Sequence, residues 1–191
     1  MTGRAVSLDH VGIVGPDLTA LARTFSDLGF HVTPLARHDG GRTANHCVML
    51  DGSYLELIST VDGGTSATLA RFMARYPGIH ILALGIDDED TAIARLTRAG
   101  LAGLHAAHTE RALNDADADA PRVGFTLVTP PDLPEGRIHL IRHLTPEAMW
   151  QEPFLAHENR ADALVEVLIA SDEPAAAAAR FSTLAGWPVG P

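Results

Sequence analysis

The fold is decided by a stretch of sequence that recurs three times along the chain. The copies are SLDHVGIVGPDLTALARTFSDLGF at 7–30, GIHILALGIDDEDTAIARLTRAGL at 78–101 and ALVEVLIASDEPAAAAARFSTLAGW at 163–187. Each begins with a short run of aliphatic, largely β-branched residues typical of a strand, followed by acidic residues that favour the start of a helix. A glycine then ends each helical pattern, as a left-handed C-cap does. We therefore expect three β-turn-α units.

The three copies agree in register within one residue. His10 lies 19 residues before Gly29, whereas His80 lies 20 residues before Gly100. The corresponding distance in the third copy is also 20 residues. Such self-similarity at a nearly fixed spacing indicates repeated structural modules.

Three further strand-like runs follow each of the first two units. After the first unit they are FHVTPLAR, TANHCVML and SYLELIS, with Asp51-Gly52 as a hairpin signal between the last two. After the second unit they are a run near 104–109, then VGFTLVT and GRIHLIRHL, with a turn expected at 134–136. The sequence therefore predicts an α+β fold of tandem βαβββ modules, in which a mixed sheet forms an open cup.

The pattern divides the chain into five segments. We expect a first βαβββ module over 6–60, a connecting helix over 66–77, a second module over 78–143, a bridge over 144–162 and a partial third module over 163–191. The third unit has no room for its last three strands, so it would expose a strand edge and an apolar helix face. We therefore expect a homodimer, with an interaction domain as a further hypothesis.

Composition excludes several classes of function. The chain has 191 residues and a formal charge of −10, and its 14 basic residues are scattered arginines, so nucleic acid is not expected as a partner. The absence of lysine excludes Schiff-base and P-loop chemistry. Cys47 is the only cysteine, which excludes a disulfide framework and favours the cytoplasm. No export signal or membrane span is expected, because no run approaches about 18 apolar residues.

A resemblance to a known family rests on several of these motifs. They are the tandem βαβββ units, LDHVGIV in the first strand, the Gly-Arg-Thr-Ala-Asn turn, SYLELIS in the fourth strand, and the bridge that starts at His143. Over residues 6–187 the chain resembles the vicinal oxygen chelate superfamily, in particular its glyoxalase-like domain proteins. The resemblance implies a cup that holds a small-molecule substrate, with a divalent metal held by side chains from the first and fourth strands of each module.

By position, the metal ligands that this resemblance implies are His10, Glu56, His80 and His139. His139 stands where glyoxalases and extradiol dioxygenases usually carry a glutamate. His143 shares one face of its strand with His139 and is the alternative ligand there. The remaining histidines are interpreted as surface, turn or packing residues; they are His31, His38, His46, His105, His108 and His157.

The residue types themselves are consistent with a metal site. Three imidazoles and one carboxylate suit Zn, Ni, Fe(II), Co or Mn, whereas Ca²⁺ would want mostly oxygen ligands. An ion with a remaining positive charge polarises a carbonyl or acidifies water. Glu56 is the candidate general base. Asn45 and Tyr54 are candidate substrate contacts; the alternatives are a turn cap for Asn45 and a packing role in the pocket for Tyr54.

Two functions of different class remain open. The first is a metal-dependent lyase, isomerase or dioxygenase acting on a small oxygenated substrate chelated to the metal. The second is a metal-free binding or sequestering protein of the resistance type on the same fold. The chain has no GxSxG elbow and no glycine-rich loop that opens a helix, which excludes the common serine hydrolases and dinucleotide enzymes.

Overall fold

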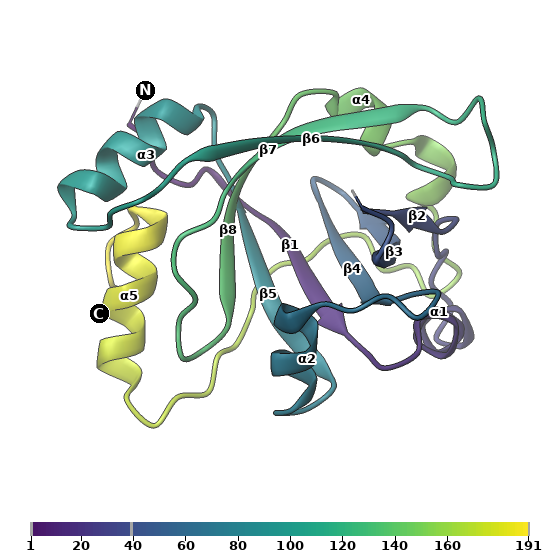
Figure 1. Ribbon diagram of the computed structural model, residues 1–191, viewed down its shortest axis with the longest axis horizontal. Coiled ribbons are helices and arrows are strands. Elements are labelled where there is room, and N and C mark those ends of the chain that lie inside the picture. The colour runs from purple at the N-terminus through teal and green to yellow at the C-terminus, as the bar shows by residue number, and fades with distance from the viewer. Residues whose placement is uncertain (1, 39, 191) are drawn as a thin grey trace.

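Two βαβββ modules and a C-terminal helix make up the chain (Figure 1). The computed structural model describes residues 2–38 and 40–190. The first module contains β1 (Ser7–Val14), α1 (Leu18–Asp27), β2 (Ala36–Arg37), β3 (Thr43–Leu50) and β4 (Ser53–Thr60). The second contains β5 (Gly78–Gly85), α3 (Glu89–Arg98), β6 (Ala106–Ala112), β7 (Arg122–Val128) and β8 (Arg137–His143). The connecting helix is α2 (Ala67–Met73), and after β8 come α4 (Pro146–Met149), a 3₁₀ turn (Glu152–Phe154) and α5 (Pro174–Ala185).

The eight strands form one mixed sheet in the order β2-β3-β4-β1-β5-β8-β7-β6. Within each module the first and fourth strands are parallel, and the modules meet where β1 and β5 pair in antiparallel fashion. The sheet curves so strongly that β2 and β6, at its opposite ends, contact each other (Figure 1). An ion pair of 3.0 Å between Arg37 on β2 and Asp115, in the loop after β6, joins the two ends of the sheet. The predicted α+β cup is confirmed.

Local chemistry explains the boundaries of the repeated units. The Asp17 carboxylate accepts a hydrogen bond from the Ala20 backbone at the start of α1, and Asp88 accepts one from Thr91 at the start of α3. The predicted hairpin at Asp51-Gly52 joins β3 to β4. Leu133 and Gly136 pair across an isolated bridge just before β8. This confirms the turn that we expected at 134–136.

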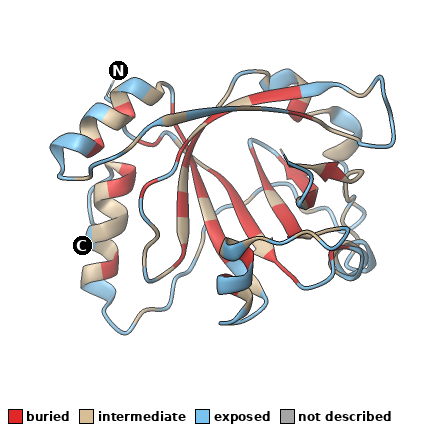
Figure 2. Ribbon diagram, viewed as in Figure 1, coloured by how far each residue is buried: buried red, intermediate tan, exposed pale blue. Residues whose placement is uncertain are grey.

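Buried residues concentrate in the central strands, as Figure 2 shows. The convex face packs against α3 and α5 through a core that includes Leu84, Leu96, Leu140 and Leu184. No helix within residues 2–38 and 40–190 is long and apolar enough to cross a membrane. On the concave side, α2 packs through Leu69 and Phe72 against Ile58 and Ile81, beside a cavity that Leu69, Ile58 and Ile81 also line.

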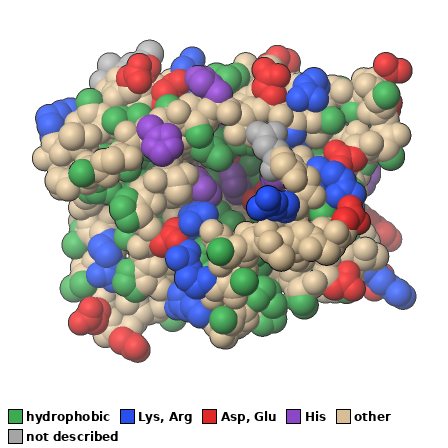
Figure 3. Space-filling view, viewed as in Figure 1, with side chains coloured by type: hydrophobic (Ala, Val, Ile, Leu, Met, Phe, Trp, Pro, Cys, Tyr) green, Lys and Arg blue, Asp and Glu red, His purple; other side chains and the backbone are tan. Residues whose placement is uncertain are grey.

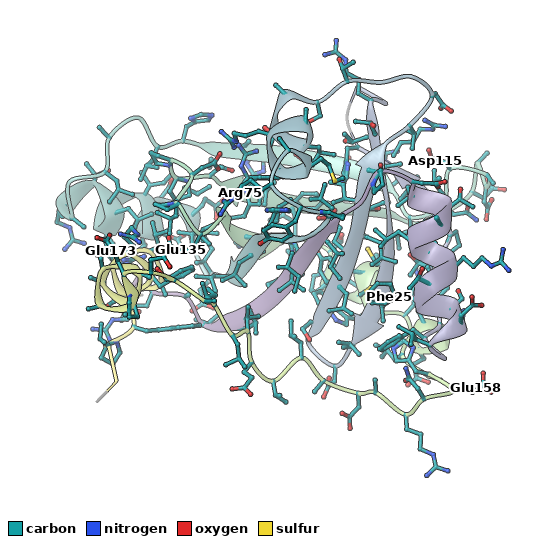
Figure 4. The ribbon with its side chains drawn as sticks, turned by 90° about the horizontal axis from the view of Figure 1, so that it is seen from below. Phe25, Arg75, Asp115, Glu135, Glu158 and Glu173 are labelled. Atoms are coloured by element: carbon teal, nitrogen blue, oxygen red, sulfur yellow. The ribbon has the colours of Figure 1, made fainter. Side chains whose placement is uncertain are left out.

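The third unit differs from the prediction. Its helix forms as α5 and packs beside the second module, where Arg180 pairs with Glu135; Figure 4 shows the labelled Glu135 and Glu173 beside this helix. The strand expected over 163–169 does not form. The segment is irregular, and its Val165 and Leu168 side chains are 84% and 85% exposed. Among the described strands none pairs with this segment, so its backbone lacks the partners that a strand requires.

Candidate functional site

A cavity of about 250 Å³ lies on the concave side of the sheet. In Figure 3 histidine and arginine side chains gather around a hollow near the middle of the visible face. The charged and imidazole residues that line the cavity are His10, His38, Glu56, Arg111, Arg137 and His139. Its apolar lining is Ile58, Leu69, Ile81, Phe125, Leu127 and Ile141, together with Tyr54. We call this space the cup cavity.

Asp9 and His10 form a buried pair at the cup cavity. Successive residues of a strand normally point to opposite faces, but the β1–β5 register shifts between Leu8 and His10, so Asp9 is the extra residue of a bulge. The Asp9 carboxylate therefore accepts a hydrogen bond from His10 Nδ1 at 2.7 Å. Burial alone would raise the pKa of Asp9, but His10 and His143 together lower it to about 2. The ionised carboxylate holds the proton on Nδ1 and leaves the His10 Nε2 lone pair free.

Glu56 lies opposite His10 Nε2. Its Oε2 atom is 4.0 Å from that nitrogen, while its Oε1 atom accepts from Asn45 Nδ2 at 2.6 Å and lies 3.2 Å from His38 Nε2. Burial acts to raise the pKa of Glu56, but the hydrogen bonds from His38 and Asn45 and the proximity of His10 hold it well below its ordinary value. Glu56 is therefore an ionised carboxylate with one oxygen occupied and the other facing His10.

His38 was interpreted from the sequence as a turn residue, and the structure places it in the site instead. It follows β2, and its Nδ1 lies 2.8 Å from the Thr43 hydroxyl, which fixes the ring while Nε2 faces Glu56. Its sequence surroundings, ARHDGG, indicate only a turn. The contact with Glu56 depends on how β2 folds back along β3, which no local pattern predicts.

His139 lines the cup cavity from β8, while its Nδ1 lies 2.8 Å from the Thr129 hydroxyl. Burial, followed by the nearby charges of His10 and Arg137, lowers its pKa to about 4. The alternative residue, His143, instead places Nε2 3.2 Å from the Asp9 carboxylate and packs its ring edge-on against Trp150. His139 thus faces the cavity directly, whereas His143 supports Asp9.

Tyr54 and Asn45, the two candidate substrate contacts, are both buried. Tyr54 lines the cup cavity, and its ring stacks on His10 with centroids 4.3 Å apart. Asn45 is 1% exposed and donates to Glu56, so in this structure it positions the carboxylate. A substrate contact for either residue stays a prediction.

His80 is not brought to the other predicted ligands. It lies on β5 between Phe72, whose ring stacks on it with centroids 5.0 Å apart, and Tyr76, whose backbone oxygen lies 2.7 Å from His80 Nε2. It lines a separate hollow beside the 167–173 segment, not the cup cavity. The expectation that His80 converges with His10 and Glu56 is therefore wrong.

The one-residue difference between the repeats explains this outcome. The helix caps Asp17 and Asp88 align the two modules, and the same offset leads from His10 to Ile81, not to His80. His80 is instead the residue of β5 that the β1–β5 register skips between Ile79 and Ile81, as Asp9 is on β1. Ile81 accordingly lines the cup cavity at the place equivalent to His10.

The donor set suits a metal by chemistry but is not assembled into a complete site. Two imidazoles and a carboxylate, from His10, His139 and Glu56, line one cavity and are of the type that binds Zn, Ni, Fe(II), Co or Mn. Throughout the described part of the chain, no three His, Cys, Asp or Glu side chains are grouped closely enough to hold an ion. The hydrogen bond that His10 Nδ1 donates to Asp9 is the outer support that metal-bound histidines usually have.

Comparison with known proteins places the chain in a family. It belongs to the family described as Glyoxalase-like domain, which matches residues 8–185, and hence to the vicinal oxygen chelate superfamily. Members of this superfamily commonly use divalent metals. A search of curated protein sequences found no match.

Solved structures share the fold at low sequence identity. Methylmalonyl-CoA epimerase from Mycobacterium tuberculosis is 21% identical with a TM-score of 0.54, and the alignment covers 78% of this chain and 96% of that one. The epimerase from Streptomyces coelicolor, solved with 2-nitronate-propionyl-CoA, is 20% identical with a TM-score of 0.50 and coverages of 73% and 96%. A hypothetical protein from Staphylococcus aureus is 15% identical with a TM-score of 0.55; the match covers 72% of this chain but only 58% of that protein.

Proposed function

We propose that this glyoxalase-like protein is an enzyme that transfers a proton on a small oxygenated substrate held in the cup cavity. The observation that supports this most strongly is the Asp9–His10 pair, in which an ionised carboxylate fixes one ring nitrogen and leaves the other facing a cavity. The same arrangement of carboxylate and imidazole prepares a general base in many enzymes. Two of the structures that share the fold are methylmalonyl-CoA epimerases by name.

In the proposed step, His10 Nε2 accepts a proton from a carbon next to a carbonyl. The electron pair of the broken C–H bond moves onto the carbonyl oxygen, and the imidazolium that forms is stabilised by Asp9 on one side and by Glu56 on the other. Return of the proton from His10 after the planar enolate has turned its other face to the imidazolium would give the epimer. Glu56 was the candidate base, but a carboxylate whose pKa is held low accepts a proton poorly at neutral pH.

A divalent metal is part of the proposal. His10, Glu56 and His139 are the residues that would hold it. When bound, such an ion supplies a Lewis acid that polarises a substrate oxygen. Because Nδ1 carries the proton that it donates to Asp9, His10 has one free lone pair, on Nε2, and this lone pair cannot serve both roles. The proton transfer assigned to His10 therefore applies to protein in which no ion occupies that nitrogen.

The alternative, a binding or sequestering protein, has its own support. Much of the cavity lining is apolar, with Phe125 and Leu127 from β7 facing Ile58 and Ile81 from the central strands. Such a surface retains an apolar ligand without any reaction.

Deuterium exchange separates these two functions. The protein is incubated in D₂O with a panel of small carbonyl-containing acids and esters, and loss of the α-proton signal is followed by NMR. We expect exchange that falls by about 100-fold or more in His10→Gln. The matched control is His80→Gln, which changes a buried histidine outside the cup cavity and should retain exchange. Binding without exchange for the whole panel would favour the sequestering function.

A further inference from the structure

Arg111 is a buried cation whose charge no side chain of the described chain neutralises. It lies on β6 and is 6% exposed, and its Nε has no hydrogen-bond partner among the described residues. Arg137, which lines the same cavity, differs because its Nε donates to Asp132 at 2.8 Å. A buried charge is costly unless it is paired, so an unpaired arginine in a cavity indicates a missing anion.

The neighbouring groups do not provide that anion. The nearby Cys47 thiol is buried, and burial raises its pKa to about 12, so it stays neutral at physiological pH. Glu56 has its Oε1 occupied by His38 and Asn45, and Oε2 faces His10. Neither Cys47 nor Glu56 therefore supplies the counter-charge of Arg111.

Arg111 is also accessible from the place where the substrate would sit. It lines the cup cavity and, on its other side, a second cavity of about 180 Å³ near Cys47 and Met49. Arg111 therefore lines both spaces, and it shares the cup cavity with His10. Phe125 lines the cup cavity from β7, the strand paired with β6.

We infer that Arg111 binds the carboxylate of the ligand, so that the substrate of the cup is a small carboxylic acid. This inference rests on the proposed function, because it names the substrate class of the same cavity. A guanidinium donates two parallel hydrogen bonds to a carboxylate, which fixes orientation as well as charge. The carboxylate would then lie at Arg111, with the remainder of the molecule between the apolar wall and His10.

The test compares acids with their neutral amides. The full chain is titrated with monocarboxylates from acetate to benzoate and with the matching amides, and binding is followed by calorimetry and thermal shift. We expect at least one acid to bind wild type roughly tenfold or more tightly than its amide. In Arg111→Met this preference should disappear, whereas Arg111→Lys should keep part of it.

The melting temperatures of the ligand-free variants show whether each variant is folded. Because Arg111→Met removes an unpaired buried charge, we expect its melting temperature without ligand to equal or exceed that of wild type. The matched control is Arg122→Met on the next strand, an exposed arginine near Glu110, which should leave the acid preference unchanged.

The outcomes separate this inference from the proposed function. If no acid is preferred over its amide, or if Arg111→Met keeps the preference, the carboxylate subsite is wrong even where deuterium exchange is observed. If acids bind through Arg111 but His10→Gln changes no exchange, the subsite stands and the proton-transfer function is wrong.

Discussion

The ring of Tyr54 lies almost flat on the ring of His10, with centroids 4.3 Å apart and planes inclined by 21°. Tyr54 is 5% exposed and also meets Trp150 edge-on, so its ring forms a buried support behind the imidazole. Position and packing of the proposed base therefore depend on an aromatic side chain from the neighbouring strand.

Replacing Tyr54 should separate packing from hydrogen bonding. We expect Tyr54→Ala to lower the free energy of unfolding by about 3 kcal/mol, because a large buried ring is lost and a cavity remains. Tyr54→Phe keeps the ring and should lower it by less than about 1 kcal/mol. Urea unfolding measures both values; a similar loss in both variants would show that the hydroxyl, and not the ring, carries the stabilisation.

Asp9 should make stability depend on acid pH. Its pKa in the folded protein is about 2, below the ordinary value of 3.8, so its contribution is present above about pH 4 and is lost as the pH falls toward 2. That shift corresponds to about 2 kcal/mol. We expect Asp9→Asn to be less stable than wild type by about this amount at pH 7, with the difference shrinking below pH 4. A constant difference across urea titrations at several pH values would contradict the pairing of Asp9 with histidines.

Metal content tests the proposed ligands. After growth in mixed Zn, Ni, Co, Mn and Fe, we expect wild-type protein to retain a divalent ion, and His10→Ala and Glu56→Gln to lose most of it. His80→Ala is the control, since this residue lies outside the cup cavity. Elemental analysis gives the occupancy, which should also fall on acidification as protons compete for imidazole nitrogens. Equal occupancy in all four proteins would remove the metal from the proposal.

Self-association remains a prediction that the structure makes easier to test. The extended segment before α5 presents Val165 and Leu168 to solvent, at 84% and 85% exposure. We expect a homodimer at micromolar concentration, weakened at least tenfold by Val165→Asp combined with Leu168→Asp. Sedimentation velocity provides the measurement, and the control is Val6→Asp at an exposed valine outside this segment. A single 20.2 kDa species in wild type would show that this apolar segment does not mediate dimerisation.

The repeated pattern predicted the fold well because it reflects interactions between residues that are close in sequence. Strand periodicity, acidic helix starts such as Asp17 and Asp88, and the Asp51-Gly52 turn each depend on neighbouring residues, and most formed as expected. The exception in the first module is the 30–37 run, of which only Ala36–Arg37 forms a strand. The 163–169 run has the same local composition but no pairing strand in the described chain, so it stayed irregular. A strand is stabilised by its partner, which composition does not supply.

Prediction of the site was less complete, for reasons of register and distance. His10, Glu56 and His139 were found at one cavity, but the difference of one residue that separates Ile81 from His80 lay within the tolerance of the repeat alignment. Asp9 was missed because only a bulge brings it to the same face as its neighbour. Arg111 was missed because its importance lies in a buried Nε atom that has no partner among the described residues, which only the folded chain reveals.

Because Ile81 stands at the position equivalent to His10, the two halves of the cup cavity differ. Two modules with identical walls would accept a ligand equally well in either of two orientations related by the axis between β1 and β5. Here one half offers an imidazole and the other a branched hydrocarbon at equivalent positions. A ligand with one polar and one apolar end would therefore enter in one orientation only. The end of the ligand that meets the base would thus be selected by a difference between two halves that otherwise share one architecture.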